Sequence, residues 1–238
     1  MSLYRDEGVV LRTLRLGEAD RIVTMVTRSH GKVRAVAKGV RRTTSKFGAR
    51  LEPLSHVHLL CWQGRELDIV NQAETAEAFR VVREDLGRVA KAFTLLEVVD
   101  HVSQERHANP ALFDMLVGAL RVLERQDAAL VVPAFCLKVL ALEGSAPVVD
   151  ECVSCGAPQG LVAFDVLEGG ALCRSCRRGR AISPGALDLV RRILGGGLAA
   201  ALGEPDGPVT REVTDLVTEA MEIHLDRRLR SVRASPGA

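Results

Sequence analysis

The hydrophobic residues of this chain change their spacing once, near Ala73, and this change limits the folds open to it. Before that point, apolar and polar residues alternate in short runs bounded by Gly, Ser and Asp, a pattern typical of half-buried β-strands. After it, apolar residues recur at intervals of three and four, as they do in amphipathic helices. The sequence therefore predicts an α+β protein whose strands come first and whose helices follow.

Five strand-like runs precede the change in spacing. They cover residues 7–14, 20–27, 31–38, 56–62 and 66–70. The turn residues Ser29-His30-Gly31 and Gln63-Gly64-Arg65 separate two pairs of these runs and predict hairpins. Five short strands are too few for a sandwich but suit a small closed β-barrel of the OB type. Residues 1–75 are accordingly predicted to form an OB-fold domain that binds nucleic acid.

The helical part is interrupted by a segment with a different composition. Helices are expected over 76–103, with Gly87 as a candidate break, from Asn109-Pro110 onward and within 128–142. Ser183-Pro184 and Gly207-Pro208 open two more helices. The inward positions of the last helix are expected to be Val209, Val213, Leu216, Val217, Ala220 and Ile223. We therefore expect a helical domain whose first part covers 76–150 and whose C-terminal part covers 181–238, around an inserted segment at 151–180.

The inserted segment carries two CxxC pairs. These are Cys152 with Cys155 and Cys173 with Cys176, and 17 residues separate the pairs. Two such knuckles bring four thiolates to one point, which is the tetrahedral donor set that zinc requires. The residues between them predict a hairpin that leads from one knuckle to the other. A complete four-thiolate set leaves no open position for substrate, so one structural zinc ion is expected. The alternative is four cysteines without a metal.

The remaining sequence features indicate a soluble chain in a reducing compartment. No run of 18 apolar residues is present, and residues 1–7 lack the apolar core of a signal peptide. A cytoplasmic location is therefore expected, where cysteines stay reduced. Cys61 and Cys136 lie in apolar stretches and are expected to be buried as small hydrophobic residues.

The positive charge of the chain is concentrated near its N-terminus. Net charge is only +2, yet residues 1–70 hold 13 Lys and Arg against 7 Asp and Glu, while residues 71–150 hold 8 against 12. Within 32–50, seven basic residues occur without a single acid. They are Lys32, Arg34, Lys38, Arg41, Arg42, Lys46 and Arg50, and Arg12, Arg15 and Arg21 extend the excess upstream. Such a run is often a solvated surface, but its lack of balancing acids favours a site for the phosphate backbone of DNA.

Aromatic residues are too few for base stacking to dominate. The sequence has one Trp, one Tyr and six Phe, of which Phe47, Trp62 and Tyr4 are near the basic run or the barrel strands. Binding is therefore expected to rest on charge, to ignore sequence, and to accept single and double strands. With about six phosphates neutralised, log K should fall with log[salt] at a slope of about −4 on single strands. A second DNA patch could be formed by Arg177, Arg178, Arg191 and Arg192.

Motifs of catalysis are missing from the sequence. It contains no GxxxxGK[ST] loop, no GxGxxG after a strand and no HExxH. The Gly195–Gly197 run follows a helix and is interpreted as its C-terminal cap. His56 and His58 alternate on a strand and are expected at the surface or half-buried. The sequence therefore predicts a protein that is not an enzyme.

Together, several motifs resemble the bacterial recombination mediator family RecO over nearly the whole chain. They are Glu7–Leu11 with Gly17–Val23, Gly31-Lys32 followed by Ala37–Arg41, Lys46–Leu54, the four-cysteine segment, and a terminal helix with His224-Leu225 and Arg227–Arg230. The resemblance implies an N-terminal OB-fold, a helical domain and a zinc hairpin. It also implies annealing of complementary DNA strands without nucleotide, at the nucleoid, and partnership with RecR and single-strand-binding protein so that RecA can load. The DNA-contacting loop of the family corresponds to Lys38, Arg41, Arg42, Lys46 and Arg50.

Two other functions remain open at this point. The chain could be a zinc-containing adaptor whose basic barrel binds an acidic protein tail rather than DNA. It could also be a metal-dependent nuclease, which would shorten DNA when magnesium or zinc is added. Tight, salt-sensitive binding to bare oligonucleotide would favour the DNA-binding mediator over the adaptor.

Overall fold

The computed structural model describes residues 2–233, which divide into two compact units. The first unit contains the chain up to Arg125 and also the segment from Ser231. The second contains Gln126–Arg230. The domain boundaries expected from the sequence stay a prediction, but the chain segment 76–125 belongs to the same compact unit as the strands.

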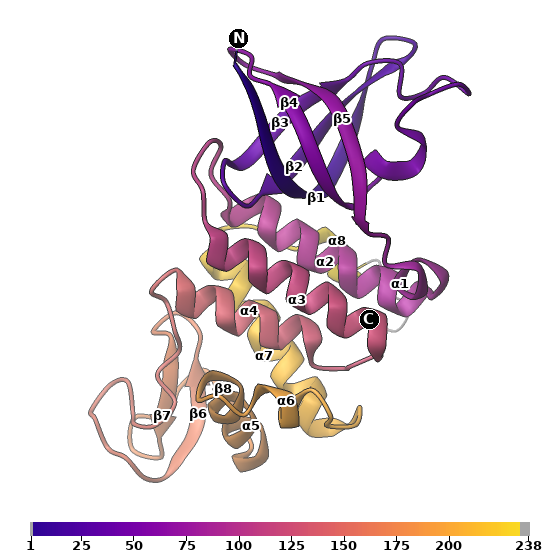
Figure 1. Ribbon diagram of the computed structural model, residues 1–238. Helices are drawn as coiled ribbons and strands as arrows, with labels where there is room; N and C mark the ends of the chain where they lie inside the picture. The colour runs from indigo at the N-terminus through magenta and orange to yellow at the C-terminus, as the bar shows by residue number, and fades with distance from the viewer. Residues whose placement is uncertain (1, 234–238) are drawn as a thin grey trace. The chain divides into compact units, whose positions relative to one another are not determined.

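The first unit begins with a closed β-barrel (Figure 1). Its strands are β1 (Leu3–Leu16), β2 (Asp20–Thr27), β3 (Gly31–Ala37), β4 (His56–Trp62) and β5 (Asp68–Glu77). The order around the barrel is β1-β2-β3-β5-β4, and β4 pairs with β1 to close it. Only β3 and β5 run parallel, over the pairs Ala35↔Asp68 and Val36↔Ile69. The OB-type barrel expected from the sequence is confirmed.

The barrel core consists of the inward residues of all five strands and of one loop. Alternation along β3 buries Val33, Ala35 and Ala37 and leaves Lys32 and Arg34 outside, as the sequence predicts. Two further core residues, Phe47 and Leu51, come from the long β3–β4 connection and its short 3₁₀ helix, Gly48–Leu51. Phe47 is only 1% exposed. The connection is therefore fixed to the barrel by a buried aromatic ring.

Three helices follow the barrel in the first unit. They are α1 (Arg80–Glu84), α2 (Leu86–Val102) and α3 (Pro110–Arg125). The expected helix start at 76 is wrong, because β5 continues to Glu77 and Phe79 takes a left-handed conformation. The break near Gly87 lies instead at Asp85, which has an extended backbone and accepts a hydrogen bond from the Arg88 amide. Asn109 caps α3 as expected, since its side chain accepts from the Leu112 amide.

A buried network connects the α2–α3 linker to the barrel. Asp68, which is fully buried, accepts two hydrogen bonds from Arg106 and one from the hydroxyl of Tyr4. Burial alone would raise the pKa of Asp68, but these donors and the Gly64 amide hold it below its ordinary value. Lys32 and Glu105 form a short parallel bridge beside this network. The linker is thus fixed against strand β3.

His56 departs from the sequence expectation. It was expected at the surface or half-buried, but it is 1% exposed, with one ring nitrogen 2.7 Å from Glu7 and the other 3.1 Å from Glu77. Glu77 in turn accepts from Arg121 of α3, which lowers the pKa of this carboxyl. His56 is therefore part of the joint between barrel and helices, whereas His58 is exposed.

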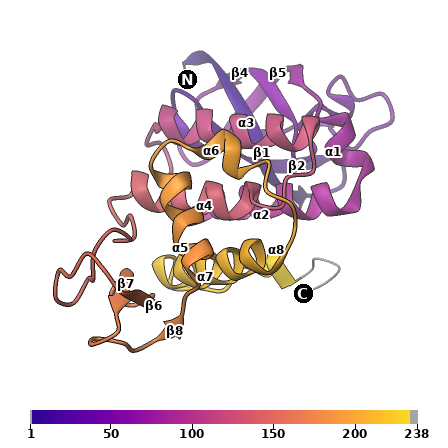
Figure 2. The same cartoon turned by 90° about the horizontal axis from the view of Figure 1, so that it is seen from below.

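The second unit contains helices and a small sheet (Figure 2). The helices are α4 (Val131–Leu142), α5 (Pro184–Leu194), α6 (Leu198–Ala201) and α7 (Pro208–His224). Helix α8 (Arg230–Arg233) begins at the last residue of this unit, and from Ser231 onward it belongs to the first unit. The expected starts at Pro184 and Pro208 are confirmed, and Gly195 ends α5. The prediction of the inward face of α7 is partly wrong, because Val209 and Ile223 are exposed while Thr210 and Met221 are buried.

The small sheet consists of three strands in the order β7-β6-β8. They are β6 (Leu161–Asp165), β7 (Gly170–Cys173) and β8 (Arg180–Ala181). The predicted hairpin between the two cysteine pairs is confirmed as β6–β7. Among residues 2–233, no helix is both long enough and apolar enough to cross a bilayer.

The structure predicts that Phe47 stabilises the barrel. Phe47→Ala should lower the free energy of unfolding of the first unit by about 3–5 kcal/mol, because it leaves a cavity in the core. Urea unfolding followed by the fluorescence of Trp62, the only tryptophan, measures this change. Phe93→Ala is the matched control, since Phe93 on α2 is 41% exposed and should change stability by less than about 1 kcal/mol. Equal effects of the two substitutions would contradict the anchoring role of Phe47.

Candidate nucleic-acid interface and metal centre

The four cysteines of the two CxxC pairs lie together in the second unit. The Sγ atoms of Cys152, Cys155, Cys173 and Cys176 are all within 4.8 Å of one another. A tetrahedral zinc ion with Zn–S bonds of about 2.3 Å separates its sulfur ligands by about 3.8 Å. Cys155 and Cys173 have this separation, 3.8 Å. The donor set and its size therefore fit a tetrahedral metal ion.

The local backbone explains why these thiols converge. Cys173 ends β7, and the β6–β7 hairpin brings it back to the first knuckle. The Gly156 amide donates to the Cys152 carbonyl and the Cys176 amide to the Cys173 carbonyl, so both knuckles are tight turns. Gly179 has a φ of +70°, and a Cβ there would lie 2.5 Å from the Phe164 carbonyl oxygen. Backbone amides directed at its sulfur lower the pKa of Cys152 to about 6.

The cluster has the character of a structural site. Its own core is small, with Ala163 and Leu172 buried beside Cys152 and Cys173. A hairpin with so little apolar burial would gain much of its stability from a metal ion held by the four cysteines. By contrast, Cys61 and Cys136 lie apart from the cluster and are buried, as expected, and burial raises the pKa of each thiol to about 12.

The basic residues predicted to contact DNA fall into two groups in the first unit. Arg12 and Lys32 both reach Asp100 of α2, while Arg34 lies 3.9 Å from Glu105. Arg21 pairs with Glu52 at 2.5 Å. Acids of α2, of the α2–α3 linker and of the β3–β4 connection thus compensate these four cations, and Lys32 is further held through a hydrogen bond to the Asp100 carbonyl. The sequence could not show this, because the partners lie up to 88 positions away.

The second group of cations forms no ion pairs among the described residues. Within the described part of the chain, no ion pair involves Lys38, Arg41, Arg42, Lys46 or Arg50, and all five are exposed. We call residues 38–50 the basic loop. Arg41 donates to the carbonyls of Gly17 and Glu18, and Lys46 donates to that of Asn71. These neutral acceptors fix the side chains without cancelling their charge. Arg15 is likewise exposed and without an acidic partner among residues 2–233.

The basic loop is an ordered turn structure. Gly39 has a φ of +66°, and its amide donates to the Asp20 carboxylate at 2.7 Å. The Arg42 amide donates to the Gly39 carbonyl, and the Ser45 amide donates to the Arg42 carbonyl. Phe47 then enters the barrel core. The backbone that carries these cations is thus fixed by hydrogen bonds and by the burial of Phe47.

Aromatic side chains contribute little to this surface. Phe47, which lies within the basic loop in the sequence, is buried in the core and is not available to stack on bases. The hydroxyl of Tyr4 is bound to Asp68. Trp62 is 39% exposed and remains available. The surface is therefore suited to phosphates more than to bases.

The second patch suggested by the sequence is compensated by carboxylates. Arg178 pairs with Asp165 and Glu168, and Arg191 pairs with Asp150. Arg192 pairs with Asp188 and Glu204. Only Arg177 has no acidic partner among the described residues. These four arginines do not form a free cationic patch, because their acids are close in the chain or the fold.

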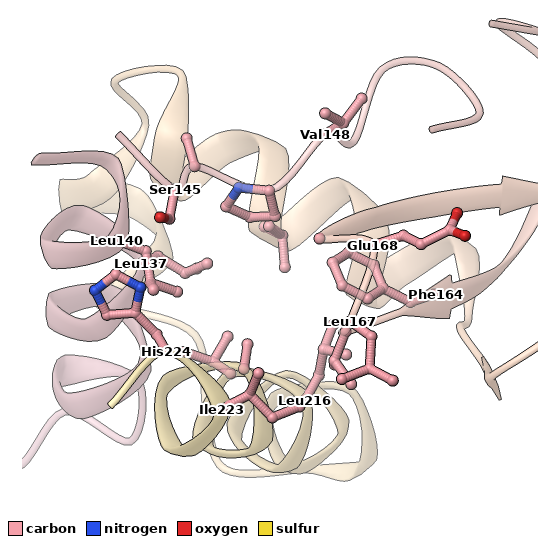
Figure 3. A pocket seen from close by; sticks show the side chains of 17 residues that line it. Leu137, Leu140, Ser145, Val148, Phe164, Leu167, Glu168, Leu216, Ile223 and His224 are labelled. Carbon is pink, nitrogen blue, oxygen red and sulfur yellow. The ribbon is translucent and has the colours of Figure 1, made fainter. Parts of the chain in front are cut away.

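An apolar pocket of about 350 Å³ lies in the second unit (Figure 3). Leu137 and Leu140 of α4, Leu216 and Ile223 of α7, and Phe164 of β6 line it, with Glu168 and His224 as polar neighbours. No Lys or Arg belongs to its lining. The pocket is therefore unsuited to a polyanion.

Comparison with family models assigns the chain to a protein family. The model described as Recombination protein O N terminal matches residues 1–79, and the model described as Recombination protein O C terminal matches residues 83–233. The chain belongs to the recombination protein O family. The barrel is thus the N-terminal part of a RecO protein, and the helices with the four-cysteine hairpin are its C-terminal part. Membership gives the protein a role in recombinational DNA repair, with DNA and repair proteins as partners.

The cysteine cluster predicts one metal ion per RecO chain. Elemental analysis of the purified protein should give one equivalent of zinc, and Cys152→Ser with Cys173→Ser should remove it. Loss of the metal should increase proteolysis within 148–182 while leaving Trp62 fluorescence unchanged, because the barrel is in the other unit. Cys136→Ala, which alters a buried cysteine outside the cluster, is the control and should retain the metal. Full metal content in the double variant would contradict this assignment.

Proposed function

We propose that this RecO protein binds single- and double-stranded DNA through its basic loop and anneals complementary strands. The observation that carries the proposal is the set of five exposed cations on a fixed loop that no acid compensates. Arg15 lies outside the loop and is likewise exposed. Arg12, Arg21, Lys32 and Arg34 are given a secondary role, because each would have to leave a carboxylate before meeting a phosphate.

Annealing requires no catalytic chemistry from this surface. Base pairing supplies the driving force, and the protein needs only to reduce phosphate repulsion and hold two strands close together. Contacts made to phosphates carry no sequence information, so any complementary pair should serve. The few exposed aromatic residues agree with binding that depends on charge and falls steeply with salt.

Family membership supports a proposal for the partners of the reaction. We propose that the protein acts with RecR to load RecA onto DNA coated by single-strand-binding protein, and that it recognises the C-terminal tail of the latter. Zinc is proposed as the metal of the cysteine cluster, with a structural role. Neither nucleotide nor membrane is part of this function.

Charge reversal in the basic loop tests the proposal. The variant Arg41→Glu, Arg42→Glu, Lys46→Glu should lose annealing of complementary oligonucleotides, measured by fluorescence energy transfer without nucleotide. The reason is that three phosphate contacts become three repulsions. A matched control reverses Arg5, Arg125 and Arg228, which are exposed and have no acidic partner among the described residues. The control should anneal like the wild type.

Two outcomes would overturn the proposal. Unchanged annealing in the loop variant would remove the basic loop from the reaction. Weak, salt-insensitive binding of bare oligonucleotide by the wild type, with tight binding to an acidic peptide, would assign the loop to a protein tail instead.

A further inference from the structure

A second surface in the first unit gathers four cations around a single acid, and no local pattern in the sequence indicates it. It is a cleft of about 640 Å³ between the end of the basic loop and the start of the helices. Lys46 and Arg50 line it from the loop, and Arg80 and Arg83 line it from α1. The hydroxyls of Ser45, Ser55 and Thr75 belong to the same lining.

The charge of this cleft is not compensated. Within the described residues, none of its four cations forms an ion pair. The single acid in the lining, Glu52, has its carboxylate 2.5 Å from Arg21. Lys46 and Arg50 donate only to backbone carbonyls. The cleft therefore has a local positive charge, unlike the barrel face where Asp100 and Glu105 meet the basic side chains.

Arg83 is held in the cleft by neutral partners. Its Nε donates to the Ala78 carbonyl, and its Nη2 donates to the Pro53 carbonyl and the Ser55 hydroxyl. Partial burial of the guanidinium lowers the pKa of Arg83, although Glu52 acts in the opposite direction. A guanidinium has five N–H donors, so those of Nη1 remain for a ligand. Arg80, one helical turn away, is exposed and has no partner among residues 2–233.

We propose that this cleft holds a backbone phosphate of the bound nucleic acid. Arg80 and Arg83 of α1 would contact the phosphate from one side of the cleft. Lys46 and Arg50, which belong to the basic loop, would contact it from the other. Planar guanidinium groups beside hydroxyls are the usual donors to phosphate oxygens. The proposal rests on DNA binding by the basic loop, and it extends the path of the strand from the loop to the first helical turn of α1.

Arg80→Gln is the first test, because Arg80 contributes charge but no described structural contact. Anisotropy of a fluorescent single strand over a salt series should show binding weakened about 3- to 10-fold, with the salt slope reduced by about 0.7. Arg80→Lys, which keeps the charge, should retain most of the affinity. Arg5→Gln, an exposed arginine on β1 with the same change in charge, should behave as the wild type.

The set of variants separates this inference from the proposed function. Arg41→Gln removes a cation of the basic loop that does not line the cleft. If Arg41→Gln weakens binding and Arg80→Gln does not, the cleft is excluded while DNA binding by the loop stands. If the wild type does not bind DNA, the proposed function fails with it. Thermal melting of each variant checks that the fold is retained, and Arg83→Lys adds a variant that keeps the positive charge at this position.

Oligonucleotides with and without a 5′ phosphate distinguish a backbone phosphate from a strand end. Equal affinity for both supports the backbone assignment. A gain of more than about ten-fold from the 5′ phosphate, abolished by Arg80→Gln, would overturn it and assign the cleft to strand ends.

Discussion

The insertion of Phe47 into the barrel core is the constraint on which the proposed interface depends. The β3–β4 connection carries five exposed cations, and a chain with that charge would be mobile without an anchor. Because Phe47 and Leu51 are buried among strand residues, the backbone on either side is anchored to the barrel. Neutral carbonyls then hold Arg41 and Lys46 in place and leave their charge available for phosphate. The same burial that stabilises the barrel therefore orders the surface proposed to bind DNA.

Position in the fold decides which cations remain free. The side chains of Arg12, Lys32 and Arg34 lie where Asp100 and Glu105 can reach them, so these charges help to join the helices to the barrel. The Arg34–Glu105 pair is exposed, and an exposed pair contributes less than about 1 kcal/mol, so a phosphate could compete for Arg34. Lys32 and Asp100 are both largely buried. The cations of the basic loop and the cleft meet no acid. The structure thus separates basic residues that attach helices from basic residues proposed to bind a polyanion.

Much of the architecture could be predicted from local patterns. Alternation along 31–37 gave the faces of β3, the proline caps gave the starts of α5 and α7, and the CxxC spacing gave the cysteine cluster. The wrong predictions concern burial and ion pairing that depend on residues far apart in the sequence. His56 is buried because Glu7, Glu77 and two phenylalanines surround it, and no local pattern encodes that arrangement. The free or paired state of each arginine is likewise set by tertiary contacts. Arg80 and Arg83 were missed because the loop that completes their cleft lies 30 positions earlier.

Lysine footprinting can show whether DNA binds along the basic loop. Acetylation of the five lysines, read by mass spectrometry with and without a single-stranded oligonucleotide, compares the basic loop with the rest of the chain. DNA bound along the basic loop should strongly protect Lys38 and Lys46 from acetylation and should change the acetylation of Lys91 and Lys138 little. Lys32, which Asp100 holds on the barrel face, should react slowly in both states. Protection centred on Lys138, or no difference at Lys38 and Lys46, would contradict a DNA path along the basic loop.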